Sequence, residues 1–121
     1  MKITLCGSTR FISEYATWNQ YLTLRRHVVY TVAGSAKHGW EITDDEKETL
    51  DLVHLAKILN SDAILVINCR LLPNGLSGSR EEREFAAGET YIGDSTRREI
   101  KWAKILSKKV SYTSSVGGSD F

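Results

Sequence analysis

The sequence predicts one α/β domain over residues 1–112, with a doubly wound, mostly parallel sheet of four to five strands flanked by helices. Two observations predict this class. Short runs rich in β-branched residues alternate with segments of helical periodicity, and the run 63–67 is apolar on both faces, as is typical of a central parallel strand. This alternation implies right-handed crossovers and a Rossmann- or flavodoxin-like sheet, whose ligands bind beyond the carboxyl ends of the strands.

The first part of the chain contains two predicted strands and one predicted helix. Residues 2–6 are apolar and β-rich, and the polar loop 7–10 follows at once, so a buried strand is expected to end there. Apolar side chains at helical spacing predict a helix over 11–26, namely Phe11, Tyr15, Trp18 and Leu22. The run 27–32 predicts a second strand, and the Gly- and Ser-rich segment 33–40 predicts a loop over the sheet edge.

A second helix is predicted to begin at Thr43. Thr43 and Glu46 have the spacing of a capping box, in which each side chain accepts a hydrogen bond from the backbone N–H of the other residue. The apolar face of this helix is predicted to hold Leu52, Leu55, Ala56 and Leu59. The central strand 63–67 follows.

The last part of the chain is irregular before it becomes periodic again. A proline, several glycines and a charge-rich patch predict an inserted loop over about 70–90, with a short helix near 81–87. A final helix is predicted over about 96–107 and a final strand over 109–112. The Ser- and Gly-rich residues 113–121 predict a flexible C-terminal tail.

The charge balance bears on the class of partner. The 121 residues include 16 basic and 15 acidic side chains, which give a net charge of +1. A nucleic-acid polymer is not an expected partner, because binding it normally requires a basic excess or stripe. A nucleotide or nucleoside partner is therefore expected to be a small molecule.

The two cysteines bear on cofactors and location. Cys6 and Cys69 lie inside or at the end of apolar runs, which is the pattern of buried, reduced thiols. The sequence lacks metal-ligand spacing, so neither a metal nor an organic cofactor is expected. No apolar stretch approaches the roughly 20 residues that span a bilayer, and no signal peptide is visible, so the expected location is the cytoplasm, away from membranes.

Gly7, Ser8, Thr9 and Arg10 form a candidate anion site at the end of the first strand. Glycine lets the backbone approach an anion, hydroxyl groups and helix N-terminal amides donate to it, and arginine adds a bidentate charge. The alternative is local: Ser8 or Thr9 caps the following helix, and Arg10 is solvated. The pattern alone leaves both interpretations open.

Glu99 is the candidate catalytic carboxylate. It is expected in the first turn of the last helix, where the positive helix end favours its ionised form. An ionised carboxylate in a cleft can attack or stabilise the sugar carbon of a nucleoside, as glycosidic chemistry requires. The alternative is that Thr96 and Glu99 form a second capping box. Asp94 either hydrogen-bonds a sugar hydroxyl or is an ordinary turn residue.

Two further positions carry candidate side chains. Trp40 and His38 lie in the predicted loop, where an aromatic plane could cover a base, although Trp40 could equally pack on the helix that begins at Thr43. His54 lies on that helix and either faces the cleft or is a surface residue.

Together these segments resemble the nucleoside 2-deoxyribosyltransferase superfamily, which includes the 2′-deoxynucleoside 5′-phosphate N-hydrolases. The matching segments are Cys6–Arg10, Asn60–Ala63, Tyr91–Thr96 followed by Glu99 and Ala103, and Lys108–Val110. The similarity covers most of the chain apart from about 70–90 and the tail.

The resemblance implies a nucleotide or nucleoside site in which Glu99 is the nucleophile. It assigns the 5′ end of the substrate to Ser8, Thr9 and Arg10, and its phosphate or sugar to Gly93, Asp94 and Ser95. It also implies a homodimer or larger homo-oligomer that completes the pocket. Exposed Trp and Tyr side chains on the first two helices are the expected contact.

Two functions follow as expectations. The first is hydrolysis or transfer at the N-glycosidic bond of (2′-deoxy)nucleoside 5′-monophosphates or nucleosides. Relatives carry an aspartate where this chain has His54, which can act as an acid near neutral pH, and Asp51 lies one turn earlier. The alternative is a non-catalytic nucleotide-binding protein, a sensor or a sequestering protein that retains the pocket. A weaker third interpretation is a relative acting on NAD or a cyclic nucleotide.

Overall fold

The computed structural model describes residues 1–32, 41–73 and 88–115. These residues contain a four-stranded, all-parallel sheet flanked by helices, which confirms the predicted α/β class. The strand order is β2-β1-β3-β4, with bounds Lys2–Gly7 for β1, Val28–Tyr30 for β2, Ala63–Ile67 for β3 and Lys109–Tyr112 for β4. The arrangement is Rossmann- or flavodoxin-like.

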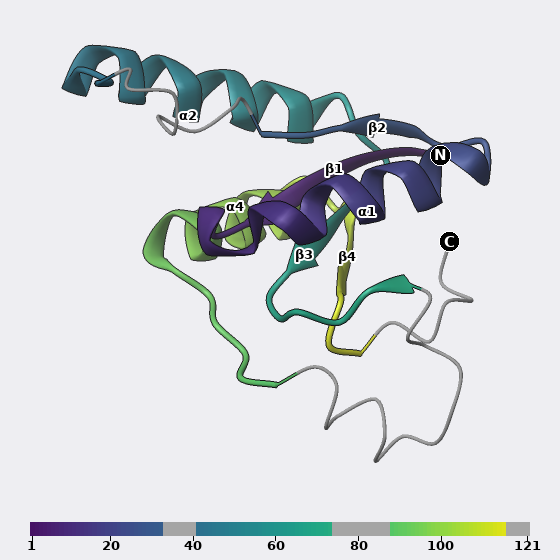
Figure 1. The fold of residues 1–121 in the computed structure, drawn as a ribbon. Helices are drawn as coiled ribbons and strands as arrows, with labels where there is room; N and C mark the ends of the chain where they lie inside the picture. Colours follow the sequence, from purple (N-terminus) through teal and green to yellow (C-terminus); the bar gives the residue numbers. More distant parts are fainter. Residues whose placement is uncertain (33–40, 74–87, 116–121) are drawn as a thin grey trace.

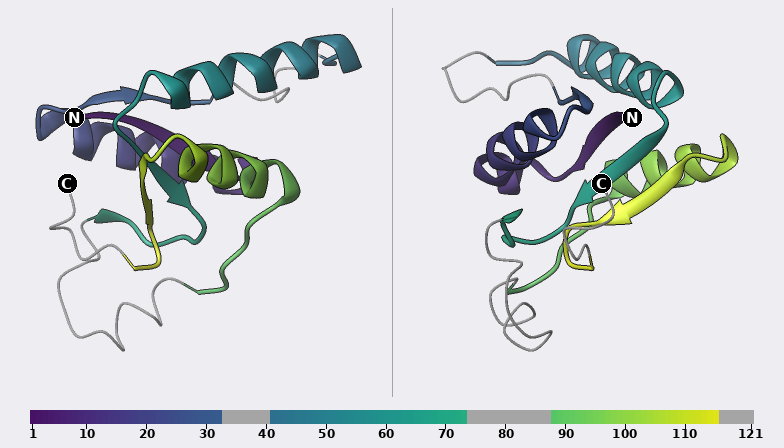
Figure 2. Two further views of the ribbon diagram at one scale, coloured as in Figure 1. Left: turned by 180° about the vertical axis from the view of Figure 1, so that it is seen from behind. Right: turned by 90° about the vertical axis from the view of Figure 1, so that its right-hand side faces the viewer.

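Helices cover both faces of the sheet (Figure 1, Figure 2). The short 3₁₀ helix η1 at Thr9–Phe11 leads into α1 at Ile12–Leu24, α2 spans Asp44–Leu59, and α4 spans Asp94–Ile105. Side chains of α1 pack on one face of β1 and β3, and those of α2 and α4 pack on the other. The chain therefore changes side between α1 and α2, which places the switch in strand order between β1 and β3.

Successive side chains of β1 point to opposite faces of the sheet, so the strand contributes to the cores on both faces. Ile3 and Leu5 face α1, whereas Cys6 packs with Ile64 and Val66 beneath α2 and α4. β3 is buried along its whole length, which confirms the prediction of a central strand. Cys6 is thus fixed under the two helices that carry His54 and Glu99.

Tyr15 and Trp18 belong to the core over the first face of the sheet. Both are buried, and Nε1 of Trp18 donates a hydrogen bond to the carbonyl oxygen of Leu71 at 3.0 Å. α2 contains no Trp or Tyr. The expectation that aromatic side chains of the first two helices form a subunit contact is therefore wrong for Tyr15 and Trp18, because α1 uses these large side chains to fill the space above the sheet.

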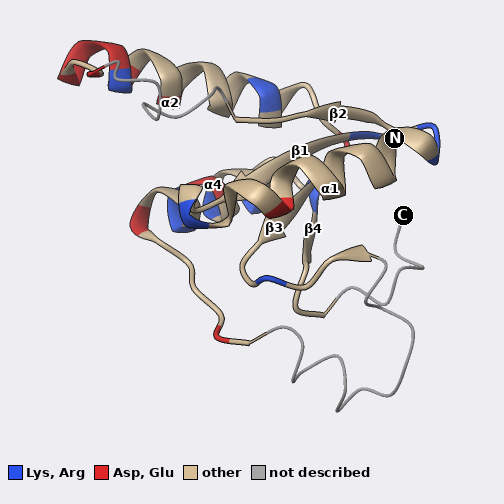
Figure 3. Ribbon diagram, viewed as in Figure 1, with Lys and Arg blue, Asp and Glu red and all other residues tan. Residues whose placement is uncertain are grey.

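α2 begins with the predicted capping box. Thr43 Oγ1 accepts a hydrogen bond from the backbone N–H of Glu46 at 3.2 Å, and Glu46 Oε1 accepts one from the backbone N–H of Thr43 at 3.1 Å. Asp44 and Asp45 add negative charge to the same turn, coloured red at the start of α2 in Figure 3. Acidic side chains at this end interact favourably with the helix dipole, so the start of α2 is locally encoded.

The buried face of α2 differs from the prediction. His54 and Ile58 are buried, whereas Leu52 and Leu59 are 59% and 50% exposed. Of the predicted apolar face, only Leu55 packs against the core. The prediction failed because aliphatic residues occur on several sides of this helix, and contact with the sheet and α4 selects one stripe among them.

α4 begins two residues earlier than predicted. Its N-cap is Gly93, and Thr96 is a buried residue of the first turn. The proposed capping box between Thr96 and Glu99 is therefore wrong, since the helix has already begun at Asp94. Glu99 lies in the second turn, and its carboxylate contacts another element instead of closing the helix start.

Several predictions fall outside the described residues. These are the loop 33–40 with His38 and Trp40, the short helix near 81–87 and the chain beyond residue 115. After β4, Thr113 is buried and its Oγ1 accepts a hydrogen bond from the backbone N–H of Asn68 at 3.2 Å. Packed structure therefore continues past the predicted domain boundary at residue 112.

Gly7→Ala is expected to destabilise the fold. Gly7 has a φ of +144°, and a Cβ atom there would collide with the carbonyl oxygen of Ile67 on β3. Backbone strain and overpacking together predict a loss of about 3 kcal/mol in the free energy of unfolding, measured by urea denaturation.

The matched control is Gly88→Ala. Gly88 has a φ of +64°, but no atom lies within 4 Å of a Cβ built there. Only the left-handed backbone conformation opposes this substitution, and the expected loss is about 1 kcal/mol. Equal losses in the two variants would contradict the close approach of β1 to β3.

Candidate functional site

An open cavity of about 740 Å³ lies beyond the carboxyl end of β1, between the first half of α2 and the start of α4. This is the side of the sheet where the strand order switches, the position at which open α/β sheets bind their ligands. The predicted site residues that line it are Gly7, Ser8, Thr9, His54, Gly93, Asp94, Ser95 and Glu99. The fold thus brings together segments that are far apart in the sequence.

The two other predicted site residues are Arg10 and Trp40. Arg10 does not line the cavity; its guanidinium group lies over the ring of Tyr91, 3.7 Å from the ring centroid, and Tyr91 is itself part of the lining. This geometry is a cation–π contact at the rim. Trp40 lies outside the described residues.

The loop after β1 is shaped by Gly7 and Ser8. The positive φ of Gly7 turns the chain out of the strand. Ser8 then caps η1, because its Oγ accepts a hydrogen bond from the backbone N–H of Arg10 at 3.2 Å. The capping interpretation of Ser8 is therefore correct, and its hydroxyl proton is still available to a ligand.

The start of α4 forms the opposite wall. Gly93 at the N-cap has no side chain to accept a hydrogen bond from the first turn, and no side-chain cap is made there. Arg98, one turn further on, donates a hydrogen bond from Nη2 to Oγ of Ser95 at 3.2 Å. Helix amides, a hydroxyl and a guanidinium group therefore adjoin one stretch of the cavity, a combination suited to an anion.

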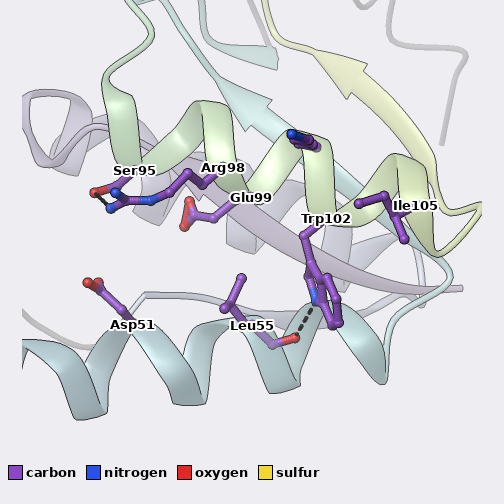
Figure 4. Close-up of a pocket in the computed structure, with 8 residues that line it drawn as sticks. Asp51, Leu55, Ser95, Arg98, Glu99, Trp102 and Ile105 are labelled. Atoms are coloured by element: carbon purple, nitrogen blue, oxygen red, sulfur yellow. Dashed lines mark hydrogen bonds between the residues drawn. The ribbon is translucent and has the colours of Figure 1, made fainter.

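Three chemically reactive side chains meet at the floor of the site. Nε2 of His54 lies 3.1 Å from Oε1 of Glu99 and 3.5 Å from Sγ of Cys6. The three residues come from α2, α4 and β1, and we call them the Cys6–His54–Glu99 cluster. Figure 4 shows Glu99 on α4, with Asp51 of α2 on the opposite side of the gap.

Unpartnered polar atoms concentrate around this cluster. In the described part of the chain, the buried side-chain atoms without a hydrogen-bond partner are Tyr15 Oη, His54 Nδ1 and Glu99 Oε2. A buried polar atom without a partner is rare in native proteins and often marks a site for a ligand, ion or water. The cluster therefore has unused hydrogen-bonding and coordination capacity.

Burial controls the protonation of the pair. Burial and the nearby charge of Asp51 raise the pKa of Glu99 to about 7, against a smaller opposing effect of Arg98. Burial and Lys57 lower the pKa of His54 to about 4. Both charged forms are disfavoured, so the 3.1 Å contact is best described as a hydrogen bond with one shared proton and not as a fully charged ion pair.

The expected effect of the helix end on Glu99 is therefore wrong. A carboxylate in the first turn was expected to be stabilised in its ionised form, but Glu99 lies in the second turn, where the influence of the helix end is weaker. Desolvation and the charge of Asp51 dominate and move its pKa upward. Burial likewise raises the pKa of the Cys6 thiol, followed by the effect of Glu99, so this thiol stays protonated and is not an activated nucleophile.

A smaller groove of about 240 Å³ adjoins the cavity (Figure 4). It runs between α2 and α4 and shares Asp51, Ser95, Arg98 and Glu99 with the larger cavity. Its other end is apolar, where Nε1 of Trp102 donates a hydrogen bond to the carbonyl oxygen of Leu55 at 3.2 Å. Glu99 thus stands between a polar cavity and a partly apolar groove.

Some site residues had only a weak sequence signal. Asp51 is one helical turn before His54, and that spacing alone places the two on one face of α2. Arg98 and Tyr91 also line the cavity; Tyr91 begins the segment 91–96 that carries the resemblance but was assigned no role, and Arg98 was marked only by its position next to Glu99. The role of Cys6 had no sequence signal, because its partners are distant along the chain.

Comparisons with models of known protein families, with curated proteins and with solved structures found no match to this chain. Within the described residues, no helix has both the length and the apolar character needed to cross a membrane.

Glu99→Gln is expected to change how stability depends on pH. Because the pKa of Glu99 rises from its ordinary 4.5 to about 7 on folding, the native protein loses stability as pH rises through this range, whereas glutamine does not ionise. The free energy of unfolding of the variant, relative to wild type, should therefore increase by about 3 kcal/mol between pH 4.5 and 8. Urea denaturation across this range measures the difference.

The matched control is Glu48→Gln, at an exposed position of α2 that lines no described cavity. Glu48→Gln removes one carboxylate from the same helix and leaves the Cys6–His54–Glu99 cluster intact, so the two variants compare the loss of a carboxylate inside and outside the site. His54 is present in all three proteins, so its own titration largely cancels. If the difference in free energy of unfolding between Glu99→Gln and wild type does not change with pH, Glu99 is not desolvated in the folded protein.

Proposed function

We propose that the protein cleaves or transfers at the N-glycosidic bond of (2′-deoxy)nucleoside 5′-monophosphates or nucleosides, with Glu99 as nucleophile. The observation that carries this proposal is the state of the Glu99 carboxyl group. It lines the cavity, Oε1 is held by His54 at 3.1 Å, and Oε2 has no partner among the described residues. A fixed carboxyl group with one uncommitted oxygen beside a nucleotide-sized cavity suits attack on a sugar carbon.

The proposed first step combines nucleophilic attack with transfer of a proton to the base. The Glu99 proton passes to Nε2 of His54, and the resulting carboxylate attacks C1′. The C1′–N bond breaks, its electron pair leaves with the base, and the base takes the proton of His54 Nδ1. The absence of a partner for Nδ1 among the described residues supports this role, which assigns the Nδ1–H tautomer to the resting state.

The proposed second step releases the sugar. Water attacks C1′ of the glycosyl ester, and the bond between C1′ and the Glu99 oxygen breaks, which releases the sugar. The water proton passes to Nδ1 of His54, and Nε2 returns its proton to Glu99; a second base in place of water gives transfer. Asp94, which lines the cavity at the first residue of α4, is assigned to a sugar hydroxyl. Asp51 also lines the cavity and keeps the proton on the Glu99–His54 pair until substrate enters.

A 5′-phosphate is proposed to lie between the loop after β1 and the start of α4. The hydroxyl groups of Ser8, Thr9 and Ser95 and the guanidinium group of Arg98 support this placement. Gly93 lines the cavity as the N-cap of α4 and makes no side-chain hydrogen bond to the first turn, so the amides of that turn are not capped by a side chain. Arg10 would contribute from the rim, where its charge lies on Tyr91.

A second function keeps the same pocket without cleavage, as a nucleotide sensor or sequestering protein. The raised pKa of Glu99 favours it, because a carboxyl group that is protonated in part at neutral pH is a weak nucleophile. The cytoplasm is the proposed location for either function. Cys6 and Cys69, both free thiols, agree with a reducing compartment.

Chromatographic detection of free base after incubation with a panel of nucleoside 5′-monophosphates and free nucleosides tests the catalytic proposal. Glu99→Gln should lower the rate at least about 1,000-fold, as expected for loss of a nucleophile, while Glu48→Gln should leave it unchanged. Full turnover by Glu99→Gln would overturn the mechanism. If no base is released but a nucleotide raises the Tm, the binding function is favoured.

A homodimer or larger homo-oligomer is proposed to complete the pocket. Ile42 and Val53 line the cavity and are 37% and 50% exposed, and Leu52, which precedes Val53 in α2, is 59% exposed. Leu52→Glu is therefore expected to shift the mass measured by light scattering toward the monomer, because a charge would be buried in the contact. Leu24→Glu on α1, where Leu24 is 76% exposed, should have no effect. A monomeric wild-type protein would contradict this part of the proposal.

A further inference from the structure

The Cys6–His54–Glu99 cluster has a property that glycosidic chemistry does not require. It presents one sulfur, one imidazole nitrogen and one carboxylate oxygen, and these three atoms all lie within 4.8 Å of one another. They come from three separate elements, β1, α2 and α4, whose positions are set by the sheet and its covering helices. The juxtaposition is therefore built into the fold and does not depend on a mobile surface.

Two of the three distances between these atoms are close to those of a tetrahedral metal site, and the third is at most 4.8 Å. With Zn–S near 2.3 Å and Zn–N and Zn–O near 2.0–2.1 Å, tetrahedral angles place sulfur and nitrogen about 3.6 Å apart, and nitrogen and oxygen about 3.3 Å apart. The corresponding distances are 3.5 Å between Cys6 Sγ and His54 Nε2, and 3.1 Å between His54 Nε2 and Glu99 Oε1. Binding by all three atoms requires Sγ of Cys6 and the Glu99 oxygen, which lie within 4.8 Å of each other, to be about 3.6 Å apart.

We propose that Cys6, His54 and Glu99 bind one Zn²⁺ ion, with a fourth position open to solvent or a ligand. The ligand chemistry favours zinc over magnesium or calcium, because a thiolate and an imidazole are poor ligands for those hard cations. Three protein ligands and one open position form the arrangement of zinc sites that bind an exchangeable ligand. Binding replaces the thiol proton of Cys6, which is released to solvent, and forms the Zn–S bond.

Two observations bear on a ligand at this place. His54 Nδ1 and Glu99 Oε2, which adjoin the proposed donor atoms Nε2 and Oε1, are among the described buried polar atoms without a partner, so hydrogen bonds within the cluster do not satisfy it. The cluster is also accessible, because His54 and Glu99 line the 740 Å³ cavity while Cys6 is fully buried behind them. A metal ion therefore has a route of access from solvent and a shielded position for the sulfur ligand.

The proposal goes beyond the proposed function and is separable from it. A Zn²⁺ ion on Oε1 of Glu99 and Nε2 of His54 occupies the groups assigned to attack and proton transfer, so Zn²⁺ should inhibit base release. Metal binding is nevertheless measured without any nucleotide. Zinc binding without base release would support the metal site and contradict the glycosidase activity. Base release without zinc binding would support the glycosidase activity and contradict the metal site.

The first experiment is a titration of the full, metal-free chain with Co²⁺, a spectroscopic substitute for Zn²⁺. We expect one ion per chain, a thiolate-to-cobalt charge-transfer band in the near ultraviolet, and the visible absorption of a four-coordinate ion, all removed by added Zn²⁺. Cys6→Ser should abolish the charge-transfer band and weaken binding by more than about 100-fold, since it removes a direct ligand.

The matched control is Cys69→Ser. Cys69 is the other buried free thiol, but its Sγ lies 3.4 Å from Oγ1 of Thr113 and away from the cluster. This variant should bind Co²⁺ with the wild-type spectrum. The band persisting in Cys6→Ser, or disappearing equally in Cys69→Ser, would overturn the assignment.

A second measurement uses only wild-type protein, in case Cys6→Ser does not fold. X-ray absorption of the zinc-loaded chain should show one sulfur neighbour at about 2.3 Å and the remaining neighbours as nitrogen or oxygen at about 2.0 Å. Only nitrogen or oxygen neighbours, or failure of the wild-type chain to retain Zn²⁺ after desalting, would overturn the proposal.

Discussion

The contact between His54 and Glu99 organises the site. It joins α2 to α4 at a buried position, and neither side chain can be left alone there without a large desolvation cost. The burial that makes the contact necessary also sets its chemistry, because it raises the pKa of Glu99 and lowers that of His54. One structural requirement, that two helices pack closely on the same face of the sheet, therefore produces a proton-sharing pair at the edge of a cavity.

The sheet supplies the third member of the cluster and the opening above it. β1 pairs in parallel with β3 up to Gly7 opposite Ile67, and this close approach tolerates no side chain at position 7. Cys6, the residue before, then points beneath α2 and α4, and the chain turns away to η1 and α1 on the other face. The connection after β1 leads to one face of the sheet, whereas α4 lies on the other face. The cavity lies between the loop after β1 and the start of α4.

Most local signals in the sequence were informative, although the Thr96–Glu99 capping box is not formed. Alternating strands and helices, the apolar run of β3 and the Thr43–Glu46 capping box all predicted what the structure contains. It was misleading on the buried face of α2, where aliphatic residues on several sides leave the rotation of the helix to tertiary packing. It also could not show that Cys6, His54 and Glu99 meet, because their separation in sequence carries no information about distance, and the ligand spacing that identifies a local metal motif is absent.

Cys6 separates the two uses of this cluster. A glycosidase of the proposed kind needs a carboxylate and a partner for its proton, and Glu99 with His54 supplies both. A buried, protonated thiol adds nothing to that chemistry, yet its sulfur lies within contact distance of the nitrogen that shares the proton. Replacement of its proton by a metal ion would give this thiol a function and would withdraw Glu99 from catalysis at the same time. On the two proposals, Nε2 of His54 and Oε1 of Glu99 hold either a shared proton or, together with Sγ of Cys6, a metal ion, and occupancy by one excludes the reaction that depends on the other.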